Sequence, residues 1–176
     1  SKGFLKFLPQ NENYIFTHNI SLMDCEQKKK FIKTFHKKIN FVWIGAVRYF
    51  EHQSKIIEKL DRDGRFNIIF HGSGSELELF RSFVKKRNLK NVSFTGSYCN
   101  TNKGKILEKA DILNNSYTMK LGTKYALSNK FYDGIIYHIP QLVECDCYKA
   151  ELLKKYPIGI GLDTNDEYFA EKLYRY

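Results

Sequence analysis

FVWIGAV, residues 41–47, is a continuous apolar run with a glycine, Gly45, near its end. A run of this kind is typical of a strand buried on both faces, as strands of a parallel sheet are. FNIIFHGSG, residues 66–74, repeats the pattern of an apolar run followed by a glycine loop. Residues 53–61 separate the two runs and carry their apolar side chains at helical spacing. The segment therefore predicts a strand–helix–strand unit.

The same alternation continues to the C-terminus. Further strands are expected at 91–96, from 111, at 141–144 and at 158–162. Further helices are expected at 75–88, 102–109, 128–137, 148–155 and 164–174. Ser75 and Glu78 have capping-box spacing for the first of these helices, and Asp166 and Glu167 fall in the first turn of the last. Residues 41–176 are thus predicted to form one α/β domain, a doubly wound, Rossmann-like parallel sheet.

The sheet type also predicts where a ligand binds. Ligands of open α/β sheets bind beyond the carboxyl ends of the strands. The loops expected at that edge are 45–48, 72–74, 96–98 and 115–128. Their polar side chains should therefore converge on one site.

Residues 1–40 do not follow the alternation, and we expect them to be a lead-in from a preceding domain. A strand at 13–20 and a basic helix at 26–38 are predicted there. The whole chain has a net charge of +10, and the lysines gather at 28–38. Such a stretch attracts phosphates, nucleic acid or an anionic membrane face, and the alternative interpretation is a solvated helix surface.

Several classes of function lack their sequence signature. The chain contains no P-loop for ATP, and Leu77 stands where a dinucleotide fingerprint requires its third glycine. No acidic pair is placed to bridge a metal to phosphates, so we expect neither a metal nor a cofactor. The four cysteines suggest no disulfide framework, which favours a cytoplasmic setting.

SNKFYDGIIYHIP, residues 128–140, contains the most specific chemistry. Lys130 lies at the start of a predicted helix, where a cation and the helix N-terminus together favour a diphosphate. Asp133 lies about one turn later, and its carboxylate suits the paired hydroxyls of a ribose. The alternative interpretation is a surface lysine and aspartate on an ordinary amphipathic helix.

The order of these motifs resembles the nucleotide-sugar-binding half of a GT-B glycosyltransferase. The motifs are IGAVR, FHGSG, NVSFTGSY, KILEKADILNNS and LSNKFYDGIIYHIPQLV, and YIFTHNI resembles the segment that leaves the N-terminal half. The closest type is the retaining, family-four class of bacterial capsule and lipopolysaccharide synthesis. The resemblance covers about residues 13–175 and implies a metal-independent transfer of a sugar from a nucleoside diphosphate.

The resemblance implies particular residue roles. Arg48, Asn129 and Lys130 would bind the diphosphate, and Asp133 would replace the glutamate that binds ribose. The family's second glutamate falls on Tyr125 and its second diphosphate lysine on Gln53, with Lys55 as a substitute. Gly45, Gly72 and Gly74 would leave room for the nucleotide, while Ser97 and Tyr98 would face the base. The probable base of the reaction would belong to the preceding half, so this chain is expected to bind donor but transfer little sugar.

The implied partners are a nucleotide sugar and, through the preceding half, a saccharide or lipid-linked acceptor. A peripheral contact with the inner face of the cell membrane fits the basic stretch, and nucleic acid is disfavoured. The base, the sugar and the acceptor are not readable from the sequence. Two alternatives stay open: a non-enzymatic nucleotide- or nucleic-acid-binding module, and a sugar-nucleotide epimerase of similar architecture.

Overall fold

The computed structural model describes residues 1–10, 12–15, 17 and 36–176 of the chain. Its strands are β1 (Ile39–Ile44), β2 (Phe66–His71), β3 (Val92–Gly96), β4 (Ile112–Asn114), β5 (Gln141–Glu144) and β6 (Gly159–Leu162). Its α-helices are α1 (Phe50–Asp63), α2 (Leu77–Arg87), α3 (Lys103–Leu107), α4 (Leu121–Tyr125), α5 (Asn129–Ile136), α6 (Tyr148–Lys155) and α7 (Phe169–Arg175). Two short 3₁₀ helices are η1 (Lys2–Phe7) and η3 (Asn100–Asn102).

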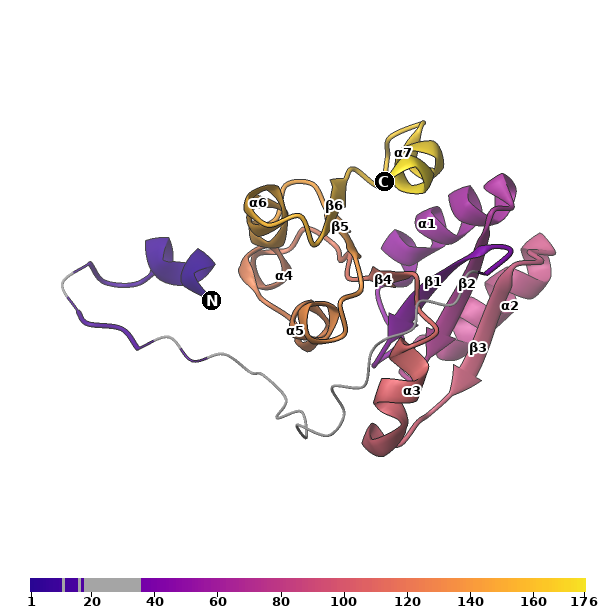
Figure 1. Cartoon of the computed structure of the whole chain (residues 1–176), viewed down its shortest axis with the longest axis horizontal. Coiled ribbons are helices and arrows are strands. Elements are labelled where there is room, and N and C mark those ends of the chain that lie inside the picture. Colours follow the sequence, from indigo (N-terminus) through magenta and orange to yellow (C-terminus); the bar gives the residue numbers. More distant parts are fainter. Residues whose placement is uncertain (11, 16, 18–35) are drawn as a thin grey trace.

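The six strands form one parallel sheet in the order β3-β2-β1-β4-β5-β6. The chain moves outward from β1 to β3 and then crosses back to β4 on the other side of β1 (Figure 1). This order is that of a Rossmann-like doubly wound fold, and it confirms the predicted fold class.

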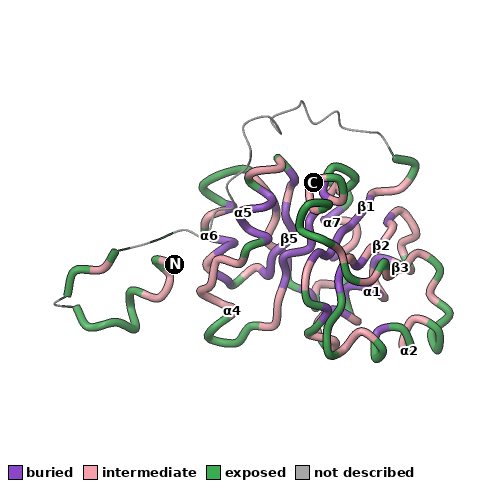
Figure 2. Tube along the Cα trace, turned by 90° about the horizontal axis from the view of Figure 1, so that it is seen from below, coloured by how far each residue is buried: buried purple, intermediate pink, exposed green. Residues whose placement is uncertain are grey.

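Helices cover both faces of the sheet. Because side chains alternate along a strand, Phe41 and Trp43 of β1 pack with α1, α2 and α7, whereas Ile44 joins α3 in a separate cluster. The second face is completed by Val143 of β5, which packs with Phe131 of α5 and with α6. Purple, buried segments accordingly run through the centre of the molecule in Figure 2.

Helix α1 begins at Phe50, three residues before its expected start, and the expected starts of α2 and α7 are wrong as well. Helix α2 begins at Leu77 without a side-chain cap, so the Ser75–Glu78 capping box does not form. The carboxylate of Glu76 instead accepts a hydrogen bond, 3.1 Å long, from the backbone N–H of Phe50 at the start of α1. This contact joins the first turns of two helices, and no local sequence pattern specifies it.

The last helix begins at Phe169 rather than at 164. Thr164 is held outside it, because its N–H and hydroxyl donate to Glu144 over 3.1 and 2.6 Å. Asp166 accepts from the N–H of Tyr168 over 2.8 Å, which makes a turn of the residues expected in the first helical turn. The expected loop 115–128 also contains the short helix α4.

The N-terminal part is described only in pieces. Helix η1 packs on α4 through Phe4 and Phe7, whose rings lie 6.0 and 5.2 Å from that of Tyr125. Residues 13–15 and 17 of the predicted strand at 13–20 are described and form no strand, and the rest of that range lies outside the described residues. Most of the basic helix predicted at 26–38, with its lysine cluster, also lies outside them. Within the described part, no helix is long and apolar enough to cross a membrane.

Candidate functional site

The loops that follow β1 and β4 meet at the topological switch point of the sheet. β1 and β4 are neighbouring strands, yet the chain leaves them toward opposite sides. In folds of this class the crevice between two such loops is the ligand site. The first loop carries Arg48 and the second carries Tyr117, and helix α5 begins shortly after the second.

The glycines of this edge are required by close packing between loops. A Cβ atom on Gly72 would lie 2.0 Å from the carbonyl oxygen of Gly45, and one on Gly74 would lie 2.3 Å from that of Val47. The N–H of Val47 donates to the carbonyl of Ser73 over 3.0 Å. The loop after β2 therefore supports the loop that carries Arg48, and a direct role for these glycines at a ligand stays a prediction.

Lys130 is a buried lysine on aromatic surfaces. The residue is only 7% exposed, and its Nζ lies 3.0 Å from the ring centroid of Trp43 and 5.0 Å from that of Tyr117. Burial lowers the pKa of Lys130 well below its usual range, and the nearby charges of Lys149 and Arg48 lower it further. Among the described residues, no carboxylate forms an ion pair with this ammonium group.

Two more cations surround the same aromatic cluster. Lys149 of α6 is only 2% exposed, and its Nζ lies 4.5 Å from the centroid of Tyr117. The guanidinium of Arg48 lies 4.9 Å from the ring of Tyr49, which itself packs edge-on against Tyr117 at 5.4 Å. Aromatic faces attract cations but do not neutralise them. The cluster is therefore electropositive and suited to an anion.

Asp133 lies one turn along α5 and is 4% exposed. Its Oδ1 accepts a hydrogen bond of 2.5 Å from Nζ of Lys103, the first residue of α3. Burial raises the pKa of Asp133, whereas Lys103 and Lys130 lower it. Asp133, the residue predicted to bind ribose, is thus buried, and one of its two carboxylate oxygens forms an ion pair with Lys103.

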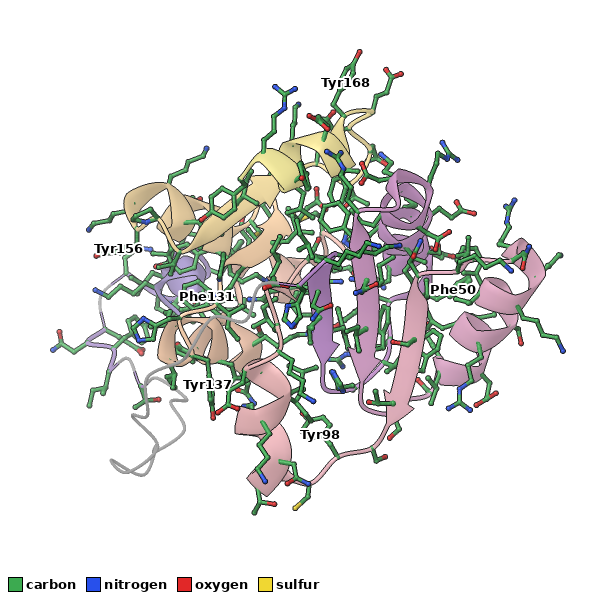
Figure 3. All side chains as sticks on the ribbon, turned by 45° about the vertical axis from the view of Figure 1, so that its right-hand side comes forward. Phe50, Tyr98, Phe131, Tyr137, Tyr156 and Tyr168 are labelled. Atoms are coloured by element: carbon green, nitrogen blue, oxygen red, sulfur yellow. The ribbon has the colours of Figure 1, made fainter. Side chains whose placement is uncertain are left out.

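Two tyrosines lie close to Asp133. Its charge contributes to the raised pKa values of Tyr98 and Tyr137, for which burial is the larger cause. Tyr137 contacts α3, since its hydroxyl lies 3.5 Å from a Cβ built on Gly104, and Figure 3 shows both tyrosines near this helix. Lys103 thus contacts the carboxylate, and Tyr98 and Tyr137 lie near enough for its charge to affect them.

A buried polar network fixes the loop that carries Tyr117. Gln53 of α1 is fully buried; its Nε2 donates to the carbonyl of Ser116 and its Oε1 accepts from Asn114, over 2.8 and 2.7 Å. His52 Nε2 lies 2.8 Å from the Ser116 hydroxyl and 3.6 Å from Glu144. Burial lowers the pKa of His52 to about 4, so its approach to Glu144 is that of a neutral ring.

Other residues expected at the site lie apart from this cluster. Gln53 is structural, and Nζ of Lys55 donates to Asn165 over 3.1 Å, so neither completes a pair with Arg48. The hydroxyl of Ser97 is exposed and donates to that of Ser73 over 3.0 Å. Asn129 is exposed at the start of α5.

Two open cavities border the cluster along the same edge. One of about 410 Å³ is lined by Arg48, Tyr49, Phe50, Glu51, Ser75, Glu76, Leu79, Thr118 and Lys120. The other, of about 620 Å³, lies beyond β5 and β6 and includes His52, Glu144 and Thr164 in its wall. Across the described part of the chain, no group of three or more metal-ligating side chains is suitably placed to hold an ion.

The sequence did not reveal Lys103, Tyr117 or Lys149. One signal for Lys149 exists: it falls on the same helical stripe as Ala150 and Leu153, which are buried apolar residues. A lysine on an apolar stripe is an anomaly that points to a function. Lys103 carries no such signal, because its role depends on the position of α3 beside α5.

The comparisons agree with this fold. No protein-family model and no curated protein matches the chain. Solved glycosyltransferase structures do match. HepE from Anabaena in complex with UDP is 12% identical, with a TM-score of 0.64 over 79% of this chain and 39% of that one. WaaG, a glycosyltransferase involved in lipopolysaccharide biosynthesis, is 15% identical, with a TM-score of 0.56 over 80% and 38%.

The catalytic domain of the cholesterol-α-glucosyltransferase from Helicobacter pylori is 12% identical, with a TM-score of 0.59. That match covers 76% of this chain and 82% of the domain. By contrast, the chain spans less than two fifths of HepE and of WaaG. The Rossmann-like sheet of this chain is therefore the fold that these GT-B glycosyltransferases share.

Proposed function

We propose that this chain binds a nucleoside-diphosphate sugar and forms the donor-binding part of a glycosyltransferase. The observation that carries the proposal is Lys130, a lysine buried beside Arg48 at the topological switch point, with which no carboxylate of the described residues forms an ion pair. A buried cation that forms no ion pair is unfavourable even with the charge of Asp133 nearby, and a bound phosphate would neutralise it. The UDP complexes of HepE support the same class of ligand.

Each residue then has a physical role. Arg48 and Lys130 neutralise the charge that develops on the leaving nucleoside diphosphate, which is the main requirement of glycosyl transfer without a metal. Asp133 accepts hydrogen bonds from the ribose hydroxyls with the oxygen that Lys103 leaves unoccupied. Tyr98 follows β3, and burial and the charge of Asp133 raise its pKa; its proposed role is to contact the base.

The finer assignment is also a proposal. The enzyme would be a retaining hexosyltransferase of the family-four type in bacterial capsule or lipopolysaccharide synthesis, with a saccharide or lipid-linked acceptor. The acceptor site and the catalytic base would come from another domain, in line with the length of HepE relative to this chain. The chain alone would therefore bind donor without transferring sugar at a measurable rate, and efficient transfer by it would contradict this division of roles.

Calorimetric titration with UDP, GDP, ADP and their glucose conjugates tests the proposal. We expect the nucleotides of one base to bind more tightly than those of the other two. Lys130→Ala and Asp133→Ala should each weaken that binding at least about tenfold, which is the effect of losing one charge-assisted hydrogen bond. Lys105→Ala, at an exposed position of α3, is the control and should bind normally. Unchanged affinity in both site variants would refute the proposed site, and no binding of any nucleotide would favour a non-enzymatic module.

A further inference from the structure

The structure leaves one buried cation without a role in this scheme. Lys149 lies on the inward face of α6 with Ala150 and Leu153, at 2% exposure, and burial lowers its pKa. Its ammonium forms no ion pair with any described residue and contacts the ring of Tyr117 instead. An apolar side chain would fit this position at a lower cost in free energy.

We propose that Lys149 is a third cation of the anion site and that it makes the site selective for a diphosphate over a monophosphate. The inference rests on the proposed function, which supplies the diphosphate. Selectivity of this kind favours the donor and the nucleoside-diphosphate product over any nucleoside monophosphate.

The geometry supports a shared ligand for Lys130 and Lys149. Their Nζ atoms lie 5.0 and 4.5 Å from the same ring centroid of Tyr117, so they are no further apart than these two distances together. Lys149 is the charge that lowers the pKa of Lys130 most, after burial. Two like charges within this range of each other repel in a poorly solvated site, and a bound anion reduces the repulsion.

With Lys149 included, the cations of the site come from two different parts of the fold. Arg48 also acts on the ammonium of Lys130, so positive charge approaches Lys130 both from the loop after β1 and from α6. The opposing charge is Asp133, which is already paired with Lys103. A diphosphate has a longer span and more negative charge than a single phosphate, so it is better suited to cations that come from two different elements.

The test compares diphosphate with monophosphate binding in Lys149→Met, which keeps the length of the side chain without its charge. UDP and UMP, GDP and GMP, and ADP and AMP are the probes. The unmodified chain should bind its preferred diphosphate at least about tenfold more tightly than the monophosphate. The ratio should fall toward one in Lys149→Met and persist in Lys149→Arg and in the exposed control Lys154→Met.

An unchanged ratio in Lys149→Met, with diphosphate binding still lost in Lys130→Ala, would overturn this inference alone. Absence of nucleotide binding in the unmodified chain would overturn the proposed function with it.

Discussion

Asp133 shows how a residue with a proposed binding role can weaken the fold that holds it. Burial raises the pKa of Asp133, so the folded state holds its proton more tightly than the unfolded state does. Its contribution to stability is therefore greatest at acidic pH and is lost as the pH rises through the raised pKa. At neutral pH the ion pair with Lys103 only partly offsets this cost.

Asp133→Asn is accordingly expected to raise the melting temperature at pH 7.5 while weakening nucleotide binding. The gain should shrink as the pH is lowered toward 4, where the wild-type carboxyl becomes protonated and neutral. Thermal denaturation of both proteins across this range measures the effect. A variant that is less stable than the wild type at every pH would show that Asp133 serves mainly as a structural ion-pair partner.

His52 has the opposite dependence on pH. Burial and, to a smaller extent, the charge of Lys55 lower its pKa to about 4, so the unfolded state binds a proton more readily between pH 6.5 and 4. Stability should therefore be complete above pH 6.5 and fall by up to about 3 kcal/mol as the pH drops to 4. Denaturant unfolding of wild type and His52→Gln should show this slope only in the wild type; equal slopes would place the titration elsewhere.

At the scale of elements, the strands and most helices could be predicted because local pattern decides them. The apolar run of β1, the stripe of α2 and the proline after α5 each specify an element without reference to the rest of the chain. The predicted bounds of β5 and α6 are confirmed at both ends. The errors lie where a distant contact overrides the local pattern, as Glu76 does by capping α1 and Glu144 by holding Thr164.

For the candidate site, the sequence predicts what the sheet topology decides but not what side-chain packing decides. Parallel strands bring the loops that follow them to one edge of the sheet, so the proximity of Arg48 and Lys130 follows from the topology. The positions of Lys103 and Lys149 do not, because they depend on how α3 and α6 pack against α5 and Tyr117. Such side-chain packing leaves almost no trace in the sequence beyond a lysine on an apolar stripe.

The contact between the two glycine loops provides a test at the scale of elements. Gly72→Ala would place a Cβ 2.0 Å from the carbonyl oxygen of Gly45, at a residue whose φ is +136°. We expect a loss of about 3 kcal/mol in stability, from overpacking and backbone strain together, with weaker anion binding as the loop of Arg48 moves.

Gly122→Ala is the matched control for this substitution. Nothing lies within 4 Å of its Cβ position, and it falls within helix α4, where alanine is favoured. It should be neutral or slightly stabilising in chemical denaturation. If both variants lose the same stability, the clash between the loops is not the cause.

At the scale of the whole molecule, the net charge of +10 leaves two kinds of anion binder to be distinguished. A nucleic-acid-binding surface releases many counter-ions, so its affinity falls by about 10³–10⁵ between 50 and 200 mM salt when it contacts six to ten phosphates. A pocket for one diphosphate involves few phosphates, and its buried cations are screened much less than exposed ones.

The proposed site predicts that nucleotide affinity falls by no more than about tenfold over that range of salt. The positions of the lysines explain the expectation: Lys130 and Lys149 lie under the loops of the switch point at 7% and 2% exposure, whereas a nucleic-acid surface requires its cations in solvent. Titration of the preferred nucleotide and of a 20-residue oligonucleotide at both salt concentrations compares the two. The opposite result is tight oligonucleotide binding with a steep salt dependence that Lys130→Ala does not change. That result would mean that nucleic acid binds to a surface other than the one at the switch point.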